Sequence, residues 1–358
     1  MRKSFLKKAA VFAISLSIIA SITGCGGAEQ ANKSGLKNGV SAKPTEEDSA
    51  DSEGGITAKK IRVAYQPGVY AANILLAKKN GYFEEEIKNL GYSDIEITWD
   101  SFDSGPPENE AFAAGAEDIG LIGDVPLLVA KASGQKTVTF AKLSSGETTV
   151  ALTIPSDSEV KDVSELKGKK IAYVKGSYGQ HFLGLLLKNA GLTFDDIEEI
   201  NLPNADIGNT VATKQADAGI IWEPGLSSTL ATGNVKILTD GTGIKSNNVF
   251  FFATQDFADN NHDALVAYIK AVERANDEIA KDPAAAAEAL TDDINLPTDT
   301  LAALLPKYEF KTYISDSDIS ELKDVENFNR EQKFAENEVD VDTFVDRKYL
   351  TDAGITSK

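Results

Sequence analysis

Residues 60 to 81 read KIRVAYQPGVYAANILLAKKNG, and this stretch decides the class of fold. Its first six residues alternate between polar or small side chains and larger apolar ones, which is typical of a strand. Residues 69–80 have helical character, and Gly81 is the residue type that ends a helix. A polar turn that starts at Gln66 joins the two. A strand, a turn and a helix in this order predict a parallel α/β sheet.

The same unit recurs along the chain on both sides of a break near residue 146. Further strands are predicted at 95–99, 138–143, 150–154, 171–174, 197–202, 218–221 and 249–253. Helices are predicted at 108–114, 125–133, 178–190, 206–215 and 263–281, with Pro283 opening another helix. Two consecutive α/β units followed by a helical tail indicate an α/β protein of two lobes with a cleft between them.

Four strand-to-helix junctions are rich in small and polar residues, and ligands of open α/β sheets bind at such junctions. The four are Tyr65-Gln66-Pro67-Gly68, Asp103-Ser104-Gly105-Pro106, Gly123-Asp124-Val125-Pro126 and Lys175-Gly176-Ser177-Tyr178. Each presents backbone N–H groups at a helix start, where anions bind. Any one of them is weak evidence, because Gly and Ser cap many helices. Four that converge predict an anion site.

The distribution of arginine restricts how an anion is held. No arginine lies between Val63 and Glu273, so the bidentate clamp that binds carboxylates is absent from the predicted cleft. A hydrogen bond to a charged group contributes about 1.5–3 kcal/mol, so four neutral donors supply about 6–12 kcal/mol before entropic costs. Micromolar binding needs about 8 kcal/mol. A sulfonate suits such a site, because its oxygens only accept hydrogen bonds and point toward several donors.

Composition excludes several functions. The formal net charge is −19, which argues against nucleic acid and against charge-driven binding to anionic membranes. Cys25 is the only cysteine and there are two histidines, so we expect no intramolecular disulfide and no metal site. No motif for a cofactor, a phosphate loop or a nucleophile elbow is present. We therefore expect a binding protein and not an enzyme.

The N-terminus predicts export. Four basic residues precede an apolar run at 9–22 that is short for a membrane span. The run ends in Ile22-Thr23-Gly24-Cys25, which resembles the lipobox of bacterial lipoproteins. The resemblance implies cleavage of residues 1–24 and lipidation of Cys25; a spare thiol beside an ordinary cleavage site is the alternative. Residues 25–59 are polar and small, and predict a flexible tether that anchors the protein outside the cytoplasmic membrane.

Several motifs resemble the substrate-binding proteins of aliphatic sulfonate and taurine importers. They are Phe102-Asp103-Ser104-Gly105, Ala113-Ala114-Gly115, residues 118–126 (DIGLIGDVP), residues 166–172 (LKGKKIA), Lys175-Gly176-Ser177 with His181, Ala216-Asp217-Ala218 and Trp222-Glu223-Pro224. The resemblance covers about 62–246 and continues loosely to the C-terminus. The family also includes relatives that bind nitrate, bicarbonate or thiamine pyrimidine precursors. The ligand therefore stays open among sulfonates, these molecules and aromatic anions.

The resemblance implies a type II periplasmic binding fold, an ABC permease as partner and a monomer. Lobe 1 is expected at 60–147 plus 249–358, and lobe 2 at 148–248. The ligand-binding residues that it implies are Gln66, Ser104, Gly105, Gly123, Asp124, Gly176, Ser177 and Trp222. Tyr178, His181 and Glu223 are further candidates, which brings the predicted set to eleven. Gln66 is expected to donate its side-chain amide, the Gly and Ser residues their backbone N–H, and Trp222 to cover the organic tail.

Other roles are open for some of these residues. His181 also suits a packing or capping role, Asp124 a helix cap, and Trp222 a core position. If Glu223 points into the cleft, a zwitterion such as taurine becomes the preferred ligand. Pro106-Pro107 depart from the pattern of the relatives. A thiamine-pyrimidine synthase is the remote enzymatic alternative, but that family carries a cysteine-rich motif and this chain does not.

Overall fold

A computed structural model describes residues 55–356. The described residues belong to one compact unit by their contacts. The predicted signal peptide, Cys25 and most of the predicted tether therefore lie outside the described residues. Among residues 55–356, no helix combines the length and the apolar character that a membrane crossing needs.

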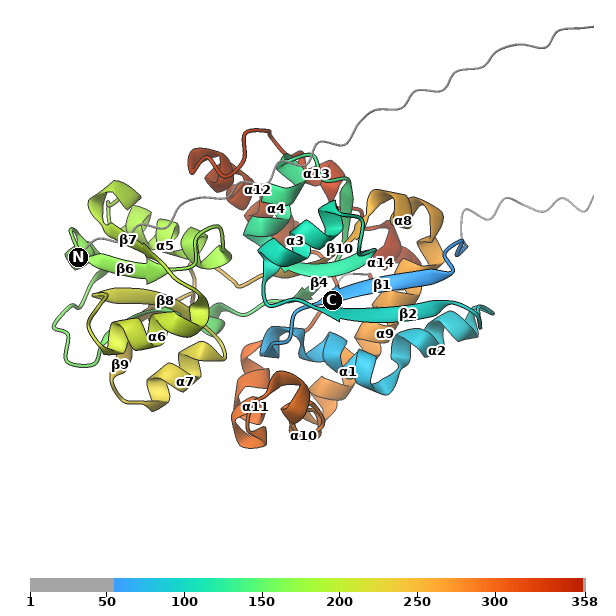
Figure 1. Cartoon of the computed structure of the whole chain (residues 1–358), viewed down its shortest axis with the longest axis horizontal. Helices are drawn as coiled ribbons and strands as arrows, with labels where there is room; N and C mark the ends of the chain where they lie inside the picture. Colours follow the sequence, from blue (N-terminus) through green and yellow to red (C-terminus); the bar gives the residue numbers. More distant parts are fainter. Residues whose placement is uncertain (1–54, 357–358) are drawn as a thin grey trace, which may run out of the picture. The chain divides into compact units, whose positions relative to one another are not determined.

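The first sheet has the strand order β2-β1-β3-β10-β4 (Figure 1). Its strands are β1 (Lys60–Tyr65), β2 (Glu96–Ser101), β3 (Ile119–Gly123), β4 (Thr137–Ser144) and β10 (Val249–Thr254). Strand β1 pairs in parallel with β2 and β3, whereas β10 runs antiparallel to β3 and β4. The alternation seen in residues 60–65 is the alternating burial of β1, since Ile61 and Val63 are fully buried.

The second sheet has the order β7-β6-β8-β5-β9. Its strands are β5 (Val150–Pro155), β6 (Lys170–Tyr173), β7 (Glu198–Asn201), β8 (Ala218–Trp222) and β9 (Val235–Asp240). Strand β6 pairs in parallel with β7 and β8, and β5 runs antiparallel to β8 and β9. The expectation of parallel sheets is thus wrong for β5 and β10. Each of these strands follows directly after a crossover from the other sheet, and so enters from the opposite end.

Helices connect and cover the strands. They are α1 (Ala72–Asn80), α2 (Tyr82–Asn89), α3 (Gly105–Ala113), α4 (Asp124–Ala132), α5 (Tyr178–Asn189), α6 (Asn204–Ala212), α7 (Gly225–Ala231), α8 (Gln255–Asn260), α9 (His262–Lys281), α10 (Pro283–Ile294), α11 (Thr298–Leu304), α12 (Asp316–Glu331), α13 (Val341–Phe344) and α14 (Lys348–Asp352). Helix α3 begins three residues before the predicted start, because Pro106 and Pro107 occupy its first turn, where a missing N–H costs nothing.

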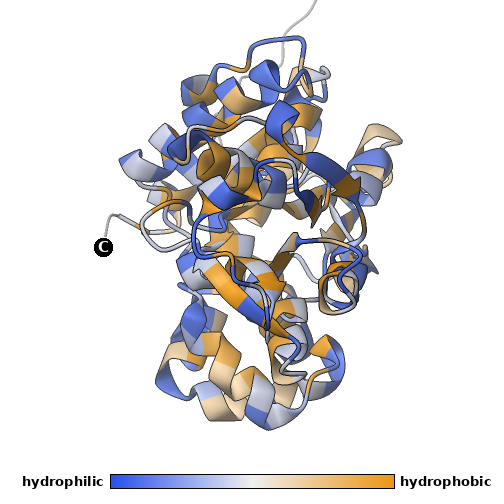
Figure 2. Cartoon of the chain, turned by 90° about the vertical axis from the view of Figure 1, so that its left-hand side faces the viewer, coloured by the Kyte–Doolittle hydropathy of each residue, from blue (hydrophilic) through white to orange (hydrophobic). Residues whose placement is uncertain are grey.

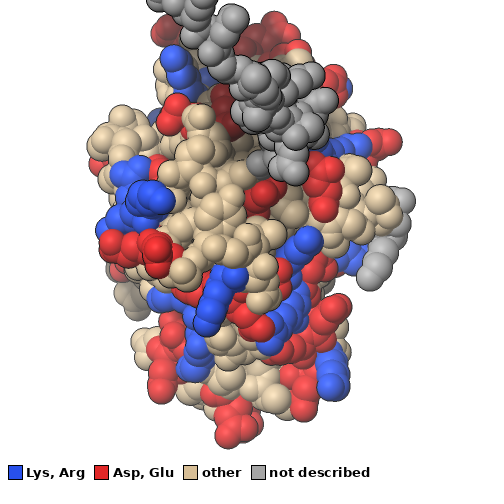
Figure 3. Space-filling model, turned by 90° about the vertical axis from the view of Figure 1, so that its right-hand side faces the viewer, with Lys and Arg blue, Asp and Glu red and all other residues tan. Residues whose placement is uncertain are grey.

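The core follows the hydrophobic pattern of these elements. Phe140, Phe251 and Tyr268 are fully buried and their rings lie in contact, with centroids 5.1–6.1 Å apart. Hydrophobic residues gather on the strands and on the helix faces turned toward them (Figure 2). Trp99 of β2 is half-buried and donates from Nε1 to Glu84 at 3.0 Å. On the outer face in Figure 3, basic and acidic side chains lie intermingled.

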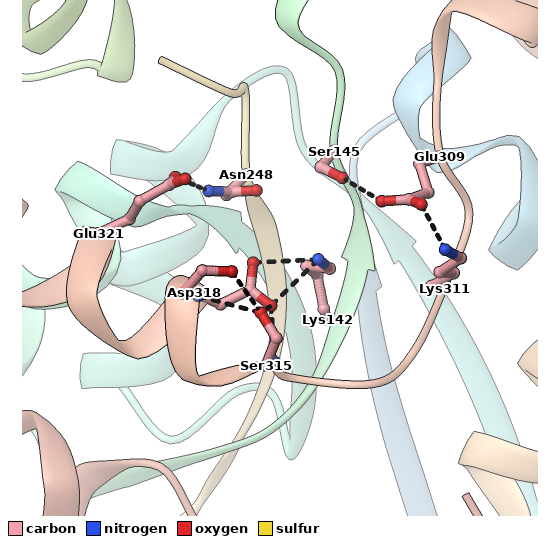
Figure 4. A network of polar contacts seen from close by, with 9 residues as sticks. Lys142, Ser145, Asn248, Glu309, Lys311, Ser315, Asp318 and Glu321 are labelled. Atoms are coloured by element: carbon pink, nitrogen blue, oxygen red, sulfur yellow. Dashed lines mark hydrogen bonds and ion pairs between the residues drawn. The ribbon is translucent and has the colours of Figure 1, made fainter. Parts of the chain in front are cut away.

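The segment from Glu309 to Glu321 binds the chain on both crossovers (Figure 4). Ser145, directly after β4, forms an isolated antiparallel bridge with Glu309, and the side chain of Asn248, directly before β10, donates to Glu321. Lys142 of β4 forms a buried ion pair with Asp318 at 3.0 Å. The C-terminal helices are therefore attached to the two connections between the sheets.

The predicted lobe boundaries place one sheet in each lobe, and they stay a prediction. Phe328 of α12, which the boundaries assign to lobe 1, packs its ring against His181 of α5 in lobe 2, with centroids 4.6 Å apart. At the other end, the N–H groups of Thr57 and Ala58 donate to Asn261 at 2.9 and 2.8 Å. Ile56 is buried. The last residues of the predicted tether are thus packed on the globular part.

Candidate functional site

A cavity of about 140 Å³ lies where loops from both sheets meet. Its walls are Gln66, Tyr70, Asp103, Ser104, Gly105, Pro106, Gly123, Pro126, Val174, Lys175, Gly176, Ser177, Tyr178, Trp222, Asn247 and Val249. All four junctions singled out in the sequence contribute. Eight of the eleven predicted ligand-binding residues line this cavity, and Asp124, His181 and Glu223 do not. Whether any of them contacts a ligand stays a prediction.

The helix starts differ in what they offer an anion. At α5, the Ser177 side chain accepts from Gly179 N–H at 3.1 Å, and Gln180 accepts from Gly176 N–H at 2.8 Å. The N–H groups of Ser177 and Tyr178 then remain available to a ligand, because the first N–H groups of a helix have no acceptor within the helix. At α3, the prolines carry no N–H, so Gly105 is the donor of the first turn.

Helix α4 offers less than its sequence predicts. The Asp124 N–H donates to the carbonyl of Asn248 at 3.3 Å, and the Val125 N–H donates to the Asp124 carboxylate at 2.8 Å. The next residue, Pro126, has no N–H. The donors that the Gly123-Asp124 junction was expected to provide are therefore used within the protein.

Gln66 belongs to a buried polar chain behind the cavity. Its amide nitrogen donates to Glu108 at 2.6 Å and to the carbonyl of Leu121 at 3.1 Å, so both amide hydrogens are used. Its oxygen accepts from the Tyr70 hydroxyl at 3.1 Å. Donation from Gln66 to a ligand, as the sequence predicts, would require one of these bonds to break.

Glu108 is fully buried beneath Gln66. Burial raises the pKa of Glu108 to about 8, although the hydrogen bonds from Gln66 and from the Leu121 N–H oppose the rise. The sequence predicts only that this residue begins a helix at 108–114. Nothing local signals its burial, because its partners come from β1 and β3.

Asp124 is buried and forms an ion pair with Lys245 in the second crossover. Its charge is thus neutralised beside the cavity. A buried carboxylate next to an anion site is tolerated when a buried cation is paired with it.

Glu223 is fully buried, and its carboxylate is occupied within the protein. It accepts from Lys307 Nζ at 2.7 Å, from the Ser227 hydroxyl at 2.8 Å and from the Ser227 N–H at 3.0 Å. A ligand ammonium therefore finds these oxygens already bonded. The hypothesis that Glu223 selects taurine gains no support from this geometry.

His181 packs as a neutral aromatic ring. Burial, together with the charge of Lys245, lowers the pKa of His181 to about 2. Its Nδ1 has no hydrogen-bond partner among the described residues. This arrangement agrees with the packing role that the sequence left open, while its ligand role stays a prediction.

Eight lining residues are not among the eleven predicted ligand contacts, and four of these are polar: Tyr70, Asp103, Lys175 and Asn247. Lys175 is the basic residue of the lining and Asp103 the acidic one. Asn247 comes from the second crossover, which carries no helix or strand pattern, so sequence offered no signal for it.

Two buried polar atoms of the lining lack a partner among the described residues: the Tyr178 hydroxyl and the Asn247 side-chain oxygen. The Tyr178 ring packs on Trp222 with centroids 5.2 Å apart. Buried polar atoms are almost always paired, so unpaired ones at a cavity point to a bound group.

Two mixed sheets, joined by two crossovers and sharing one cavity, define a two-lobed periplasmic-binding fold of type II, as the sequence predicts. The crystal structure of the periplasmic aliphatic sulphonate binding protein SsuA from Escherichia coli is similar, with a TM-score of 0.74 and 25% identity. The match covers 81% of this chain and 93% of that chain.

The chain belongs to the NMT1/THI5 like family, which residues 69–286 match. A protein of Escherichia coli K12 named for binding aliphatic sulfonates is 32% identical over 201 residues, which are 56% of this chain. This chain spans about three fifths of that relative, 61% of its length. A Bacillus subtilis 168 protein with the same name is 28% identical over 298 residues, 82% of this chain and 88% of that protein.

Some proteins that are similar to this chain are named as enzymes. A 4-amino-5-hydroxymethyl-2-methylpyrimidine phosphate synthase of Saccharomyces cerevisiae is 26% identical over 235 residues, 61% of this chain and 66% of that protein.

Proposed function

We propose that this chain is the extracytoplasmic solute-binding protein of an ABC importer and that it binds a small organic sulfonate. The unpaired Tyr178 hydroxyl in the wall of a cavity shared by both sheets carries the proposal. It is a buried neutral donor without an acceptor among residues 55–356, and a sulfonate oxygen would supply one. The names of the Escherichia coli and Bacillus subtilis relatives support the same class of ligand.

The lining of the cavity favours an anion that is bound without the bidentate arginine that clamps carboxylates. No arginine is among its lining residues, and Lys175 with the N–H groups at the starts of α3 and α5 supplies the positive side. An ammonium group on the ligand would meet Asp103 alone, because the Glu223 carboxylate is bonded to Lys307 and Ser227. We therefore favour a plain alkanesulfonate over taurine.

Binding without catalysis is the second part of the proposal. The lining contains serine hydroxyls but neither a histidine nor a cysteine, so it holds no Ser–His or Cys–His pair. Glu108 is fully buried behind Gln66. These features support a binding protein over the pyrimidine synthase alternative.

The location and partners form a third part. Lipidation of Cys25, a monomeric state and delivery to a membrane permease remain proposals that follow from the sequence. Replacing Cys25 by Ser is expected to move the protein from the membrane fraction to the soluble extracytoplasmic fraction. Unchanged membrane association of Cys25→Ser would remove the anchor.

Titration calorimetry tests the ligand with ethanesulfonate, taurine, nitrate, bicarbonate and sulfate. Tyr178→Phe removes the hydroxyl and keeps the ring. The loss of one hydrogen bond to a charged group weakens sulfonate binding by roughly 10- to 100-fold.

Tyr268→Phe is the matched control. The buried hydroxyl of Tyr268 also has no partner in the described part of the chain, but Tyr268 lies in the core and does not line the cavity. Its affinity for sulfonate is expected to equal that of the unaltered protein. Tight binding of nitrate or bicarbonate with no binding of any sulfonate would refute the proposed ligand class.

A further inference from the structure

A second, larger cavity of about 960 Å³ lies beside the candidate site. Helices α3 and α4 form much of its wall, with the apolar residues Phe112, Ala113, Val129 and Ala130. Its remaining boundary includes the ring of Phe334. With Pro106 and Pro126, these apolar residues offer a surface for the hydrocarbon part of a ligand, while the other lining residues are polar, charged or glycine.

The two cavities share four wall residues: Pro106, Pro126, Lys175 and Gly176. The prolines are apolar and lie in the first turns of α3 and α4, and Lys175 is an exposed basic residue of the shared wall. An anionic head group on one side of these residues thus has an apolar surface directly on the other side.

The volumes of the two cavities suit different parts of a ligand. The smaller one is close to the roughly 150 Å³ of an apolar cavity that accepts a benzene molecule. A sulfonate group with a short chain fills it. A longer tail needs further room, and the larger cavity adjoins the smaller one at the four shared residues.

We propose that the larger cavity is the tail site of the ligand, and that the preferred ligands are sulfonates with an uncharged apolar tail of about six carbons or more, or with an aromatic ring. This inference rests on the proposed sulfonate function and specifies its substrate class. The edge of the larger cavity carries Glu110 and Asp256 as well as Lys136, so a second negative charge on the tail meets no uniformly basic surface.

The test is calorimetry on the full-length protein with ethane-, butane-, hexane- and octanesulfonate. Each methylene that becomes buried is expected to tighten binding roughly fourfold. Octanesulfonate should therefore bind at least about 100-fold tighter than ethanesulfonate.

Ala113→Trp fills the larger cavity from the end of α3, where the residue is exposed and leaves the smaller cavity untouched. It is expected to abolish the gain from chain length and to keep ethanesulfonate binding within about twofold. Ala231→Trp, at the exposed end of α7, is the matched control and should change neither value. Val129→Thr replaces a methyl group by a hydroxyl group at nearly constant volume, and it should reduce octanesulfonate affinity several-fold.

The outcomes separate the two proposals. Equal affinity for short and long sulfonates, or a length gain that survives Ala113→Trp, overturns the tail site while the sulfonate function stands. Absence of binding for every sulfonate overturns both.

Discussion

Removal of the Lys245 ammonium is the sharpest test of how the candidate site tolerates a buried carboxylate. The side chains of Lys245 and Asp124 are 3% and 2% exposed, and they pair with each other between the second crossover and the start of α4. In Lys245→Met, the Asp124 carboxylate keeps only the bond from the Val125 N–H. A buried charge without its partner destabilises a protein strongly.

The expected cost is about 3–5 kcal/mol of the free energy of unfolding, the range for breaking a buried pair by removing one partner. Lys214→Met is the matched control: Lys214 pairs with Asp157 at 2.6 Å, but the two side chains are 62% and 67% exposed. An exposed pair contributes less than about 1 kcal/mol. Burial alone distinguishes the two substitutions.

Urea unfolding at pH 7, with extrapolation to zero denaturant, measures both costs. The double variant Lys245→Met with Asp124→Asn removes the charge as well, and is expected to recover most of the loss. The reasoning is refuted if Lys245→Met costs no more than Lys214→Met, or if the double variant is less stable than Lys245→Met alone.

Three other predictions concern stability. The pKa of Glu108 is about 8 in the folded protein and near 4.5 when unfolded, so the free energy of unfolding falls as the pH rises from about 4.5 to about 8. Glu108→Gln removes this fall, gains at most about 5 kcal/mol at pH 8, and is measured by urea unfolding across that range; an unchanged pH profile would contradict it. Gly120→Ala places a Cβ 2.5 Å from Glu108 Oε1 and costs about 1–3 kcal/mol by thermal unfolding, whereas Gly123→Ala, whose Cβ has no neighbour within 3.9 Å, costs little. Asn261→Ala removes the acceptor of two backbone N–H groups near residue 57 and should expose that segment to protease; an unchanged cleavage rate would show that these bonds do not hold it.

Local patterns predicted most of the fold. Helix α5 begins at Tyr178 with Ser177 as its cap, because Ser177 accepts from Gly179 N–H within two residues of sequence. Strand β9 was missed because its residues 236–240 are exposed or half-buried and give a weak apolar signal. The antiparallel placement of β5 and β10 depends on the path of the chain between sheets, which no local window contains.

The candidate site was predictable as a set of loops and not as a set of bonds. Glycine and serine at the junctions identify where α3 and α5 begin. The ionisable partners of Gln66, Asp124 and Glu223 lie 42, 121 and 84 residues away along the chain. Such separations hide which polar atoms remain free for a ligand.

The central position of β10 in the first sheet affects how the protein folds during synthesis. Residues 249–254 fill the gap between β3 and β4, so those two strands keep open edges until the ribosome has made another hundred residues or so. Open edges invite pairing with other chains. No uninterrupted gene fragment encodes the first sheet by itself, and an attempt to produce that half alone must splice the late strand back into its place.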